Sequence, residues 1–304
     1  MSPSLHRRLA DGNPAPLQPK TRGREHTPAM TTSAYRLTDP ISPYLALTRH
    51  FALVVQMARR DVAGRYRGSF AGLLWSFFNP LLMLAIYTFV FGVIFKSRWN
   101  AQTTNPFQYA MVLFAGLNIN ALFSECANRA TTLIVENTNF VKRVVFPLET
   151  LTWSTLGSGL FHLCVSTVVL LVISPLVMGH LPWTAIFFPI VVVCFLPFVA
   201  GTVWLLAALG VYLRDLKQAV GIATTALIFL APILYPATLI PERYRFALYF
   251  NPLTIIAEAS QNVLIWGRLP RWDHLAAYAV VASLFAWFAF AWFERTRKGF
   301  ADVV

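Results

Sequence analysis

Residues 150–213 read TLTWSTLGSGLFHLCVSTVVLLVISPLVMGHLPWTAIFFPIVVVCFLPFVAGTVWLLAALGVYL and contain no Asp, Glu, Lys or Arg. A membrane-spanning helix needs about 20 largely apolar residues, because it rises about 1.5 Å per residue across a hydrocarbon core of about 30 Å. This stretch is therefore long enough for two spans. Ser174-Pro175 and the segment 179–182, Gly-His-Leu-Pro, mark the turn between them. The expected fold class is an all-α integral membrane protein.

The composition of the whole chain supports that class. Of the 304 residues, 57% are hydrophobic and only 12% are charged, and the mean hydropathy is +0.57. A water-soluble domain of this size has too little interior to bury so large an apolar fraction. Residues 70–300 therefore form the expected transmembrane domain, with six spans at about 70–95, 109–135, 148–174, 184–212, 218–240 and 274–293.

The apolar stretch 248–267 carries only Glu258 as an acidic residue, so it could form a seventh span or a re-entrant hairpin. The distribution of Lys and Arg separates these alternatives. With six spans, the basic residues before the first span, in the loops at 142–143 and 214–217, and in the C-terminal tail share one side. Because cytoplasmic segments carry an excess of Lys and Arg, both termini are expected in the cytoplasm. We therefore expect short re-entrant helices at about 241–268.

Residues 46–69 repeat apolar side chains at helical spacing and carry polar and basic side chains on the opposite face. This pattern predicts an amphipathic interfacial helix at the cytoplasmic membrane surface, and a cytoplasmic helix packed on the bundle is the alternative. Residues 1–45 are rich in Pro, Arg and polar residues and lack the apolar region of a signal peptide. We expect them to form a disordered cytoplasmic tail. Met30 is a plausible alternative start.

The net charge of +12 and the pI near 10.1 raise the question of a nucleic-acid partner. The basic residues lie in short clusters beside long apolar runs rather than in one stripe, which indicates contact with membrane lipids and no nucleic acid. The three cysteines, Cys126, Cys164 and Cys194, are far apart in apolar segments and show no C-x-x-C spacing. They are expected to be small packing residues rather than zinc ligands or halves of disulfides.

The chain lacks the residue patterns of an enzyme or a metal site. The carboxylates nearest the apolar spans, Glu125, Glu149 and Glu258, are widely separated in sequence, and no H-E-x-x-H or G-x-S-x-G occurs. No Gly-Lys dipeptide exists, so the chain has no P-loop with which to bind ATP. We therefore expect no catalytic residue, no metal and no cofactor in this chain. If ATP drives transport, ATP and Mg²⁺ bind to a separate polypeptide.

Two charged residues interrupt the second span. Glu125 and Arg129 are spaced i, i+4, so they can pair on one helix face and lower the cost of placing either charge in an apolar region. They could form a polar element near the cytoplasmic mouth of a transport pathway. Alternatively, they form a structural ion pair that faces a neighbouring helix.

The loop at residues 136–147, ENTNFVKRVVFP, is short, polar and amphipathic, and the six-span topology places it in the cytoplasm. Such a segment suits docking into a groove of a partner protein, with an aromatic anchor and basic residues for charge complementarity. A basic loop that only follows the positive-inside rule is the alternative. The candidate docking residues are Glu136, Asn139, Phe140, Lys142, Arg143 and Pro147.

Several motifs resemble the type-2 ABC exporter permeases, and within that group the branch that exports O-antigen, capsular polysaccharide or teichoic acid. The stretch 91–99, FGVIFKSRW, is similar to the O-antigen members in particular. The resemblance covers about residues 45 to 300. It rests also on residues 59–69 (RRDVAGRYRGS), 72–75 (GLLW), 79–81 (NPL), 139–147, and 251–254 (NPLT) with Glu258.

The resemblance implies the architecture expected above, with a coupling helix in the 136–147 loop that contacts the ATPase. It implies a homodimer of permeases with two copies of a nucleotide-binding ATPase subunit in the bacterial inner membrane, forming a channel for a polyprenyl-pyrophosphate-linked glycan. Guanidinium groups bind phosphate bidentately. The residues expected to meet the lipid pyrophosphate at the cytoplasmic entrance are Arg59, Arg60, Arg65 and Arg67.

Aromatic residues make up 14% of the chain, and several lie inside the first span. Tyr87 and Phe91 share a helix face there, and Trp75 lies near the start of the span. Flat rings could stack on passing sugars, so these three are channel candidates together with Glu125 and Arg129. Packing against lipid is the alternative role for the aromatic residues.

Other functions remain open at this point. An ion-coupled lipid or glycan flippase is expected to carry charged groups at mid-membrane, and the charge-free stretch 150–213 weakens that alternative. A membrane-embedded transferase acting on polyprenyl phosphate would need clustered carboxylates or histidines near the interface, which the sequence lacks. A drug or small-lipid exporter of the same superfamily is not separated from a polysaccharide exporter by these residues.

Overall fold

The computed structural model describes residues 41–96, 106–141 and 146–303, and these residues form helices and no strand. All of them belong to one compact unit, within Tyr35–Val304. Most of the tail predicted at 1–45 therefore lies outside the described residues, as do Lys142 and Arg143. The prediction of an all-α fold is confirmed.

Five apolar helical stretches of the described chain are long enough to cross a bilayer. They match five of the six predicted spans closely, because a long and mostly apolar run in a helical conformation satisfies its own backbone hydrogen bonds in hydrocarbon. They are α3 (Trp75–Tyr87) with the π-helical turn Thr88–Ile94, α4 (Pro106–Ala130), α7 (Glu149–Met178), the short helix Trp183–Phe187 with α8 (Phe188–Tyr212), and α12 (Trp272–Thr296).

The remaining predicted span, 218–240, is helical over a shorter range. The helix α9 covers Leu216–Leu230, and its 15 residues make it shorter than the bilayer core. Pro232 and Pro236 follow it; each lacks a backbone N–H, and each disfavours a helical conformation in the residue before it. The count of six spans stays a prediction.

The turn predicted between the third and fourth spans lies later than Ser174-Pro175. The helix α7 continues through Pro175 to Met178, and Gly179 ends it with φ of 76°, a left-handed conformation that glycine adopts without strain. Pro175 has no backbone N–H, so the hydrogen bond to the residue four positions before it is missing, and the helix ends one turn later.

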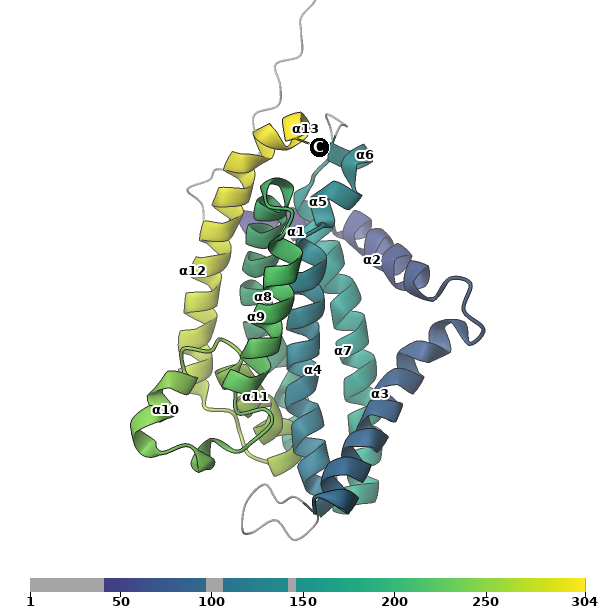
Figure 1. Cartoon of the computed structure of the whole chain (residues 1–304), viewed down its shortest axis with the longest axis vertical. Helices are drawn as coiled ribbons and strands as arrows, with labels where there is room; N and C mark the ends of the chain where they lie inside the picture. Colours follow the sequence, from purple (N-terminus) through teal and green to yellow (C-terminus); the bar gives the residue numbers. More distant parts are fainter. Residues whose placement is uncertain (1–40, 97–105, 142–145, 304) are drawn as a thin grey trace, which may run out of the picture. The chain divides into compact units, whose positions relative to one another are not determined.

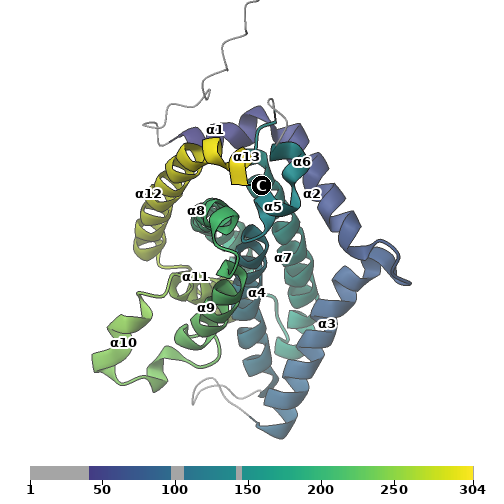
Figure 2. The ribbon, with the colours of Figure 1, turned by 45° about the horizontal axis from the view of Figure 1, so that its top comes forward.

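Short helices lie at both ends of the bundle (Figures 1 and 2). One end holds α1 (Ser42–Arg49), α5 (Leu133–Glu136), α6 (Thr138–Val141) and α13 (Phe300–Val303). The other end holds α10 (Glu242–Leu248) and α11 (Thr254–Gln261), which occupy the segment where re-entrant helices were predicted. The helix α2 (Phe51–Tyr66) runs at an angle to the long helices and covers most of the segment predicted to be interfacial.

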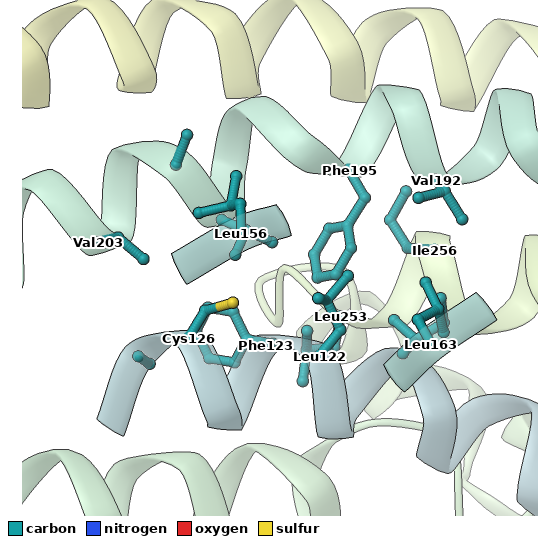
Figure 3. Close-up of a cluster of buried hydrophobic side chains, with 14 of the residues drawn as sticks. Leu122, Phe123, Cys126, Leu156, Leu163, Val192, Phe195, Val203, Leu253 and Ile256 are labelled. Carbon is teal, nitrogen blue, oxygen red and sulfur yellow. The ribbon is translucent and has the colours of Figure 1, made fainter. Parts of the chain in front are cut away.

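The core lies around α8, which packs along α12 and also contacts α4 and α7. Trp204 of α8 is fully buried between Phe290 of α12 and Trp153 of α7, with ring centroids 5.1 and 5.5 Å apart. Figure 3 shows Phe195 of α8 pointing toward Phe123 of α4. Dispersion between these rings fixes the helices side by side, since helices in a bilayer gain little from hydrophobic burial against each other.

The long helices differ in how much of their surface the bundle covers. In the most apolar part of α4, 78% of the residues are buried, whereas in the most apolar part of the first span, Gly72–Ile94, only 11% are buried. Large apolar side chains such as Phe77, Phe78 and Phe89 of that span are exposed. This helix therefore lies at the edge of the bundle and presents an apolar surface to lipid or to another protein.

Candidate functional site

Four charged side chains join α2 to α4 at one end of the bundle. Asp61 and Arg65 lie one turn apart on α2, and Glu125 and Arg129 lie one turn apart on α4. Arg65 donates to a Glu125 carboxylate oxygen, and Arg129 Nη2 lies 3.1 Å from Asp61 Oδ2. On both helices the acid comes four residues before the arginine, and the helices run in opposite directions at this contact, so each arginine faces a carboxylate. We call these four residues the ionic cluster.

The helix α7 completes the surroundings of the ionic cluster. Arg129 Nη1 donates to Ser158 Oγ at 2.6 Å, and Ser154 Oγ lies 3.4 Å from Asp61 Oδ2. The serines satisfy the hydrogen-bonding capacity that the ion pairs leave over, which reduces the cost of partly burying the charges. Three helices that are distant in sequence therefore meet at one polar site.

Tyr66 of α2 and His162 of α7 form a further polar contact next to the ionic cluster. The Tyr66 hydroxyl lies 3.4 Å from His162 Nδ1, and the two rings meet edge to face. Burial raises the pKa of the Tyr66 phenol above its usual range, so the hydroxyl stays protonated and can donate. The end of α2 is thus attached to α7 as well as to α4.

The prediction that Glu125 and Arg129 share one face agrees with their separation of 4.0 Å between Oε1 and Nη1. Their closer partners are on α2, so they face a neighbouring helix. Sequence reasoning missed Asp61. The available signal was its spacing of four residues before Arg65, which repeats the acid-then-arginine order of Glu125 and Arg129.

The four arginines predicted at the entrance do not share one environment. Arg65 pairs with Glu125, whereas Arg60 lies 3.6 Å from Asp61 and stands over the Phe140 ring, 5.8 Å from its centroid. Arg67 is exposed just beyond α2, and it forms no ion pair with another described residue. Arg59 lines an apolar groove between α2 and α7.

The predicted docking loop is described up to Val141 and again from Phe146. Phe140 and Phe146 stack with centroids 4.4 Å apart and planes at 18°, which closes the loop at its base. Glu136 and Asn139 are exposed, whereas Pro147 is half-buried and accepts a hydrogen bond from Thr150. The described parts of the loop therefore combine exposed polar residues with a stacked aromatic base at one end of the bundle.

Arg297, which the sequence did not single out as a site residue, attaches this loop to the last long helix. It donates to the Phe146 carbonyl oxygen at 2.9 Å and to Glu149 Oε2 at 3.0 Å, and it lies 3.4 Å from Glu294 Oε1. The two carboxylate side chains are only 3% and 2% exposed. The loop, the start of α7 and the end of α12 therefore share one buried ionic contact.

The three aromatic channel candidates also differ. Trp75 is exposed and packs beside Phe78, with centroids 6.3 Å apart. Phe91 stacks on the buried Tyr109 at 5.4 Å, so its ring belongs to the contact between the first span and α4. Tyr87 is half-buried. In the described part of the chain, no three His, Cys, Asp or Glu side chains gather as metal ligands would.

Comparison with known proteins matches residues 52–265 to the family of ABC-2 type transporters. The chain belongs to this family. The matched residues run from α2 to the π-helical turn Asn262–Trp266, so they include the ionic cluster and the predicted docking loop of the permease.

Individual relatives of the permease are similar over most of their length. The O-antigen export system permease protein RfbA of Myxococcus xanthus is 30% identical over 85% of this chain and 97% of its own. A protein of the same name from Klebsiella pneumoniae is 26% identical over 84% of this chain and 95% of its own. The polysialic acid transport protein KpsM of Escherichia coli is 24% identical over 79% of this chain and 91% of its own. The resemblance to polysaccharide-export permeases is confirmed.

Proposed function

We propose that this permease is the membrane subunit of an ATP-driven exporter of polyprenyl-pyrophosphate-linked polysaccharide, with O-antigen as the cargo, in the bacterial inner membrane. The observation that carries the proposal is the similarity to an O-antigen export permease along 97% of that protein's length. The similarity to a polysialic acid transport protein makes a capsular polysaccharide the second candidate. Teichoic acid, drug and lipid cargoes are further alternatives.

The energy for export comes from a partner in this proposal. The chain has no P-loop, so two copies of a separate ATPase subunit bind ATP and Mg²⁺ and act on a homodimer of the permease. The sparse burial of the first span supports a second copy, because its exposed apolar face is available for contact. Trp75 lies on that exposed helix and is the aromatic candidate best placed to line a channel between two copies.

The loop at 136–147 is the docking segment for the ATPase in this proposal. Movement of the loop would reach the end of α12 through Arg297, which donates to the Phe146 carbonyl oxygen. It would reach α7 through Glu149, which pairs with the same arginine. The ionic cluster would then carry the movement from α4 and α7 to α2.

Charge reversal tests this docking segment. Lys142→Glu with Arg143→Glu should weaken co-purification of the ATPase and uncouple ATP hydrolysis from export, while the permease still folds. The matched control is Arg214→Glu with Lys217→Glu, which reverses two exposed charges at the start of α9. If the first double variant exports glycan and binds the ATPase as the wild type does, the segment is not the docking site.

The lipid pyrophosphate would meet the arginines around the end of α2. Arg67 is exposed, and Arg60 and Arg65 already lie beside carboxylates, so a pyrophosphate would replace one anionic partner by another. Neutralising Arg60, Arg65 and Arg67 should reduce the stimulation of ATP hydrolysis by lipid-linked glycan. Unchanged stimulation would place the headgroup elsewhere.

The function as a whole is tested by reconstituting the permease with its ATPase in vesicles. Lipid-linked O-antigen should raise ATP hydrolysis and move across the bilayer, whereas the same lipid without the glycan should do so less. Export that stops when an ion gradient is dissipated while ATP is present would favour an ion-coupled flippase. Nucleotide hydrolysis by the purified chain alone would contradict the proposal.

A further inference from the structure

An apolar groove of about 600 Å³ lies between α2 and α7. Val55 and Val62 of α2 form one side, and Leu160 and Phe161 of α7 form the other. At its base the two helices touch closely, because a Cβ added at Gly157 of α7 would lie 2.9 Å from the Ala58 Cβ. The groove is therefore a defined hollow where α2 leaves the bundle, and Figure 1 shows α2 diverging from α7.

Arg59 is the one charged residue among those that line the groove. On the same helix, Arg60 and Arg65 each lie beside a carboxylate, whereas Arg59 forms no ion pair with another residue of the described ranges. A guanidinium group at the edge of an apolar hollow is complementary to a molecule with one anionic end and one hydrocarbon end.

The surroundings favour a lipid over a protein segment as the occupant. Pockets of about 300–1,000 Å³ hold a single small molecule, whereas a helix with its side chains is about 10–12 Å across. The groove lies beside exposed apolar side chains of the helices that border it, Phe51 at 60% and Leu73 at 54% exposure. Since the long helices span a membrane, hydrocarbon chains surround this region.

We propose that the groove binds one anionic phospholipid of the surrounding leaflet, with an acyl chain between α2 and α7 and the phosphate on Arg59. The site lies beyond the export function proposed above, because the ligand is a resident membrane lipid and not the cargo. The bound chain fills the hollow beneath α2 and holds this helix at its angle to the bundle.

Native mass spectrometry of the permease with its ATPase tests the site. The complex is prepared from cells that make no lipid-linked glycan and is titrated with phosphatidylglycerol or with zwitterionic phosphatidylethanolamine, without ATP. The wild type should retain phosphatidylglycerol preferentially. Arg59→Ala should weaken its retention about fivefold and remove the preference, because one arginine near a membrane surface contributes about 1 kcal/mol.

A second variant tests the hollow itself. Ala63→Trp places an indole in the groove and should abolish retention of both lipids. Ala52→Trp adds the same ring to an exposed position of α2 that does not line the groove, and Arg295→Ala removes an exposed arginine elsewhere; both should bind as the wild type does. Inorganic phosphate should not displace the lipid, because it has no hydrocarbon chain.

Several results would overturn the proposal. They are a wild-type complex that retains no phospholipid, equal retention by Arg59→Ala, or undiminished retention by Ala63→Trp. Displacement of phosphatidylglycerol by added polyprenyl phosphate at equal concentration would assign the groove to the cargo lipid instead. Since the assay contains neither glycan nor ATP, a failure of the export proposal leaves each of these results interpretable.

Discussion

Arg297 donates to the Phe146 carbonyl oxygen at 2.9 Å and so ties the end of α12 to the residue that precedes α7 by three positions. The same guanidinium faces Glu149 and Glu294, so one positive charge stands against two nearly buried carboxylates. Removal of the arginine and removal of one carboxylate are therefore expected to have opposite consequences.

Arg297→Ala should lower the stability of the folded permease by roughly 3 kcal/mol or more, because it leaves two buried carboxylates without a cation. Glu294→Gln should be neutral or stabilising, since the Arg297–Glu149 pair remains and one negative charge is removed. Thermal unfolding in detergent, followed by size-exclusion chromatography, measures both. Equal destabilisation by the two variants would show that the charge imbalance does not matter.

The ionic cluster predicts coupling between α2 and α4. Asp61→Asn and Arg129→Gln should each destabilise the protein by about 1–3 kcal/mol, because each leaves a charged partner partly buried. The double variant should lose less than the sum, with an interaction energy of about 0.5–3 kcal/mol. Arg129→Gln combined with Arg268→Gln, a distant exposed arginine, should be additive. Additivity in both cases would contradict the contact between the helices.

Gly210 predicts a steric requirement where α8 passes the end of α4. A Cβ at this position would overlap the Thr131 carbonyl oxygen, which is backbone and cannot move alone. Gly210→Ala should therefore prevent accumulation of folded permease in the membrane. Gly221→Ala on α9 is the control, because its nearest neighbour would lie at 3.7 Å and alanine favours a helix. Normal accumulation of Gly210→Ala would disprove the close packing.

The arrangement of the short helices predicts which residues face each side of the membrane. In a variant without native cysteines, single cysteines at Leu239 and Arg268 should react with an impermeant maleimide added outside the inner membrane. Cysteines at Gln56 and Val303 should react only after permeabilisation, because the basic segments around them are expected in the cytoplasm. Labelling of residue 303 from outside would require an odd number of spans.

The sequence was sufficient for most of the long helices. Their ends could be placed within a few residues, because membrane insertion depends on the length and charge of a local run. It was insufficient at α9, where hydropathy alone extended the helix across Pro232, and at Pro175, which lies inside α7. A proline breaks or ends a helix according to its position in it, and hydropathy carries no information on that position.

For the candidate site, the sequence identified Glu125 with Arg129 and the loop containing Phe140, because each depends on spacing within one segment. It did not identify the partners. Asp61 and Arg129 are 68 residues apart, and Phe146 and Arg297 are 151 apart. Contacts at such separations depend on how the helices are rotated and crossed.

By itself, the sequence determined that this protein is a bundle of apolar helices in a membrane and that residues 1–304 contain no P-loop motif, since both follow from which residues occur in local order. Only the tertiary structure decided that α2 pairs with the charged residues of α4, that Arg297 contacts the base of the predicted docking loop, and that Arg59 borders an apolar groove. The physical reason is that hydrophobicity acts residue by residue, whereas ion pairs and grooves require groups from separate helices within a few ångströms.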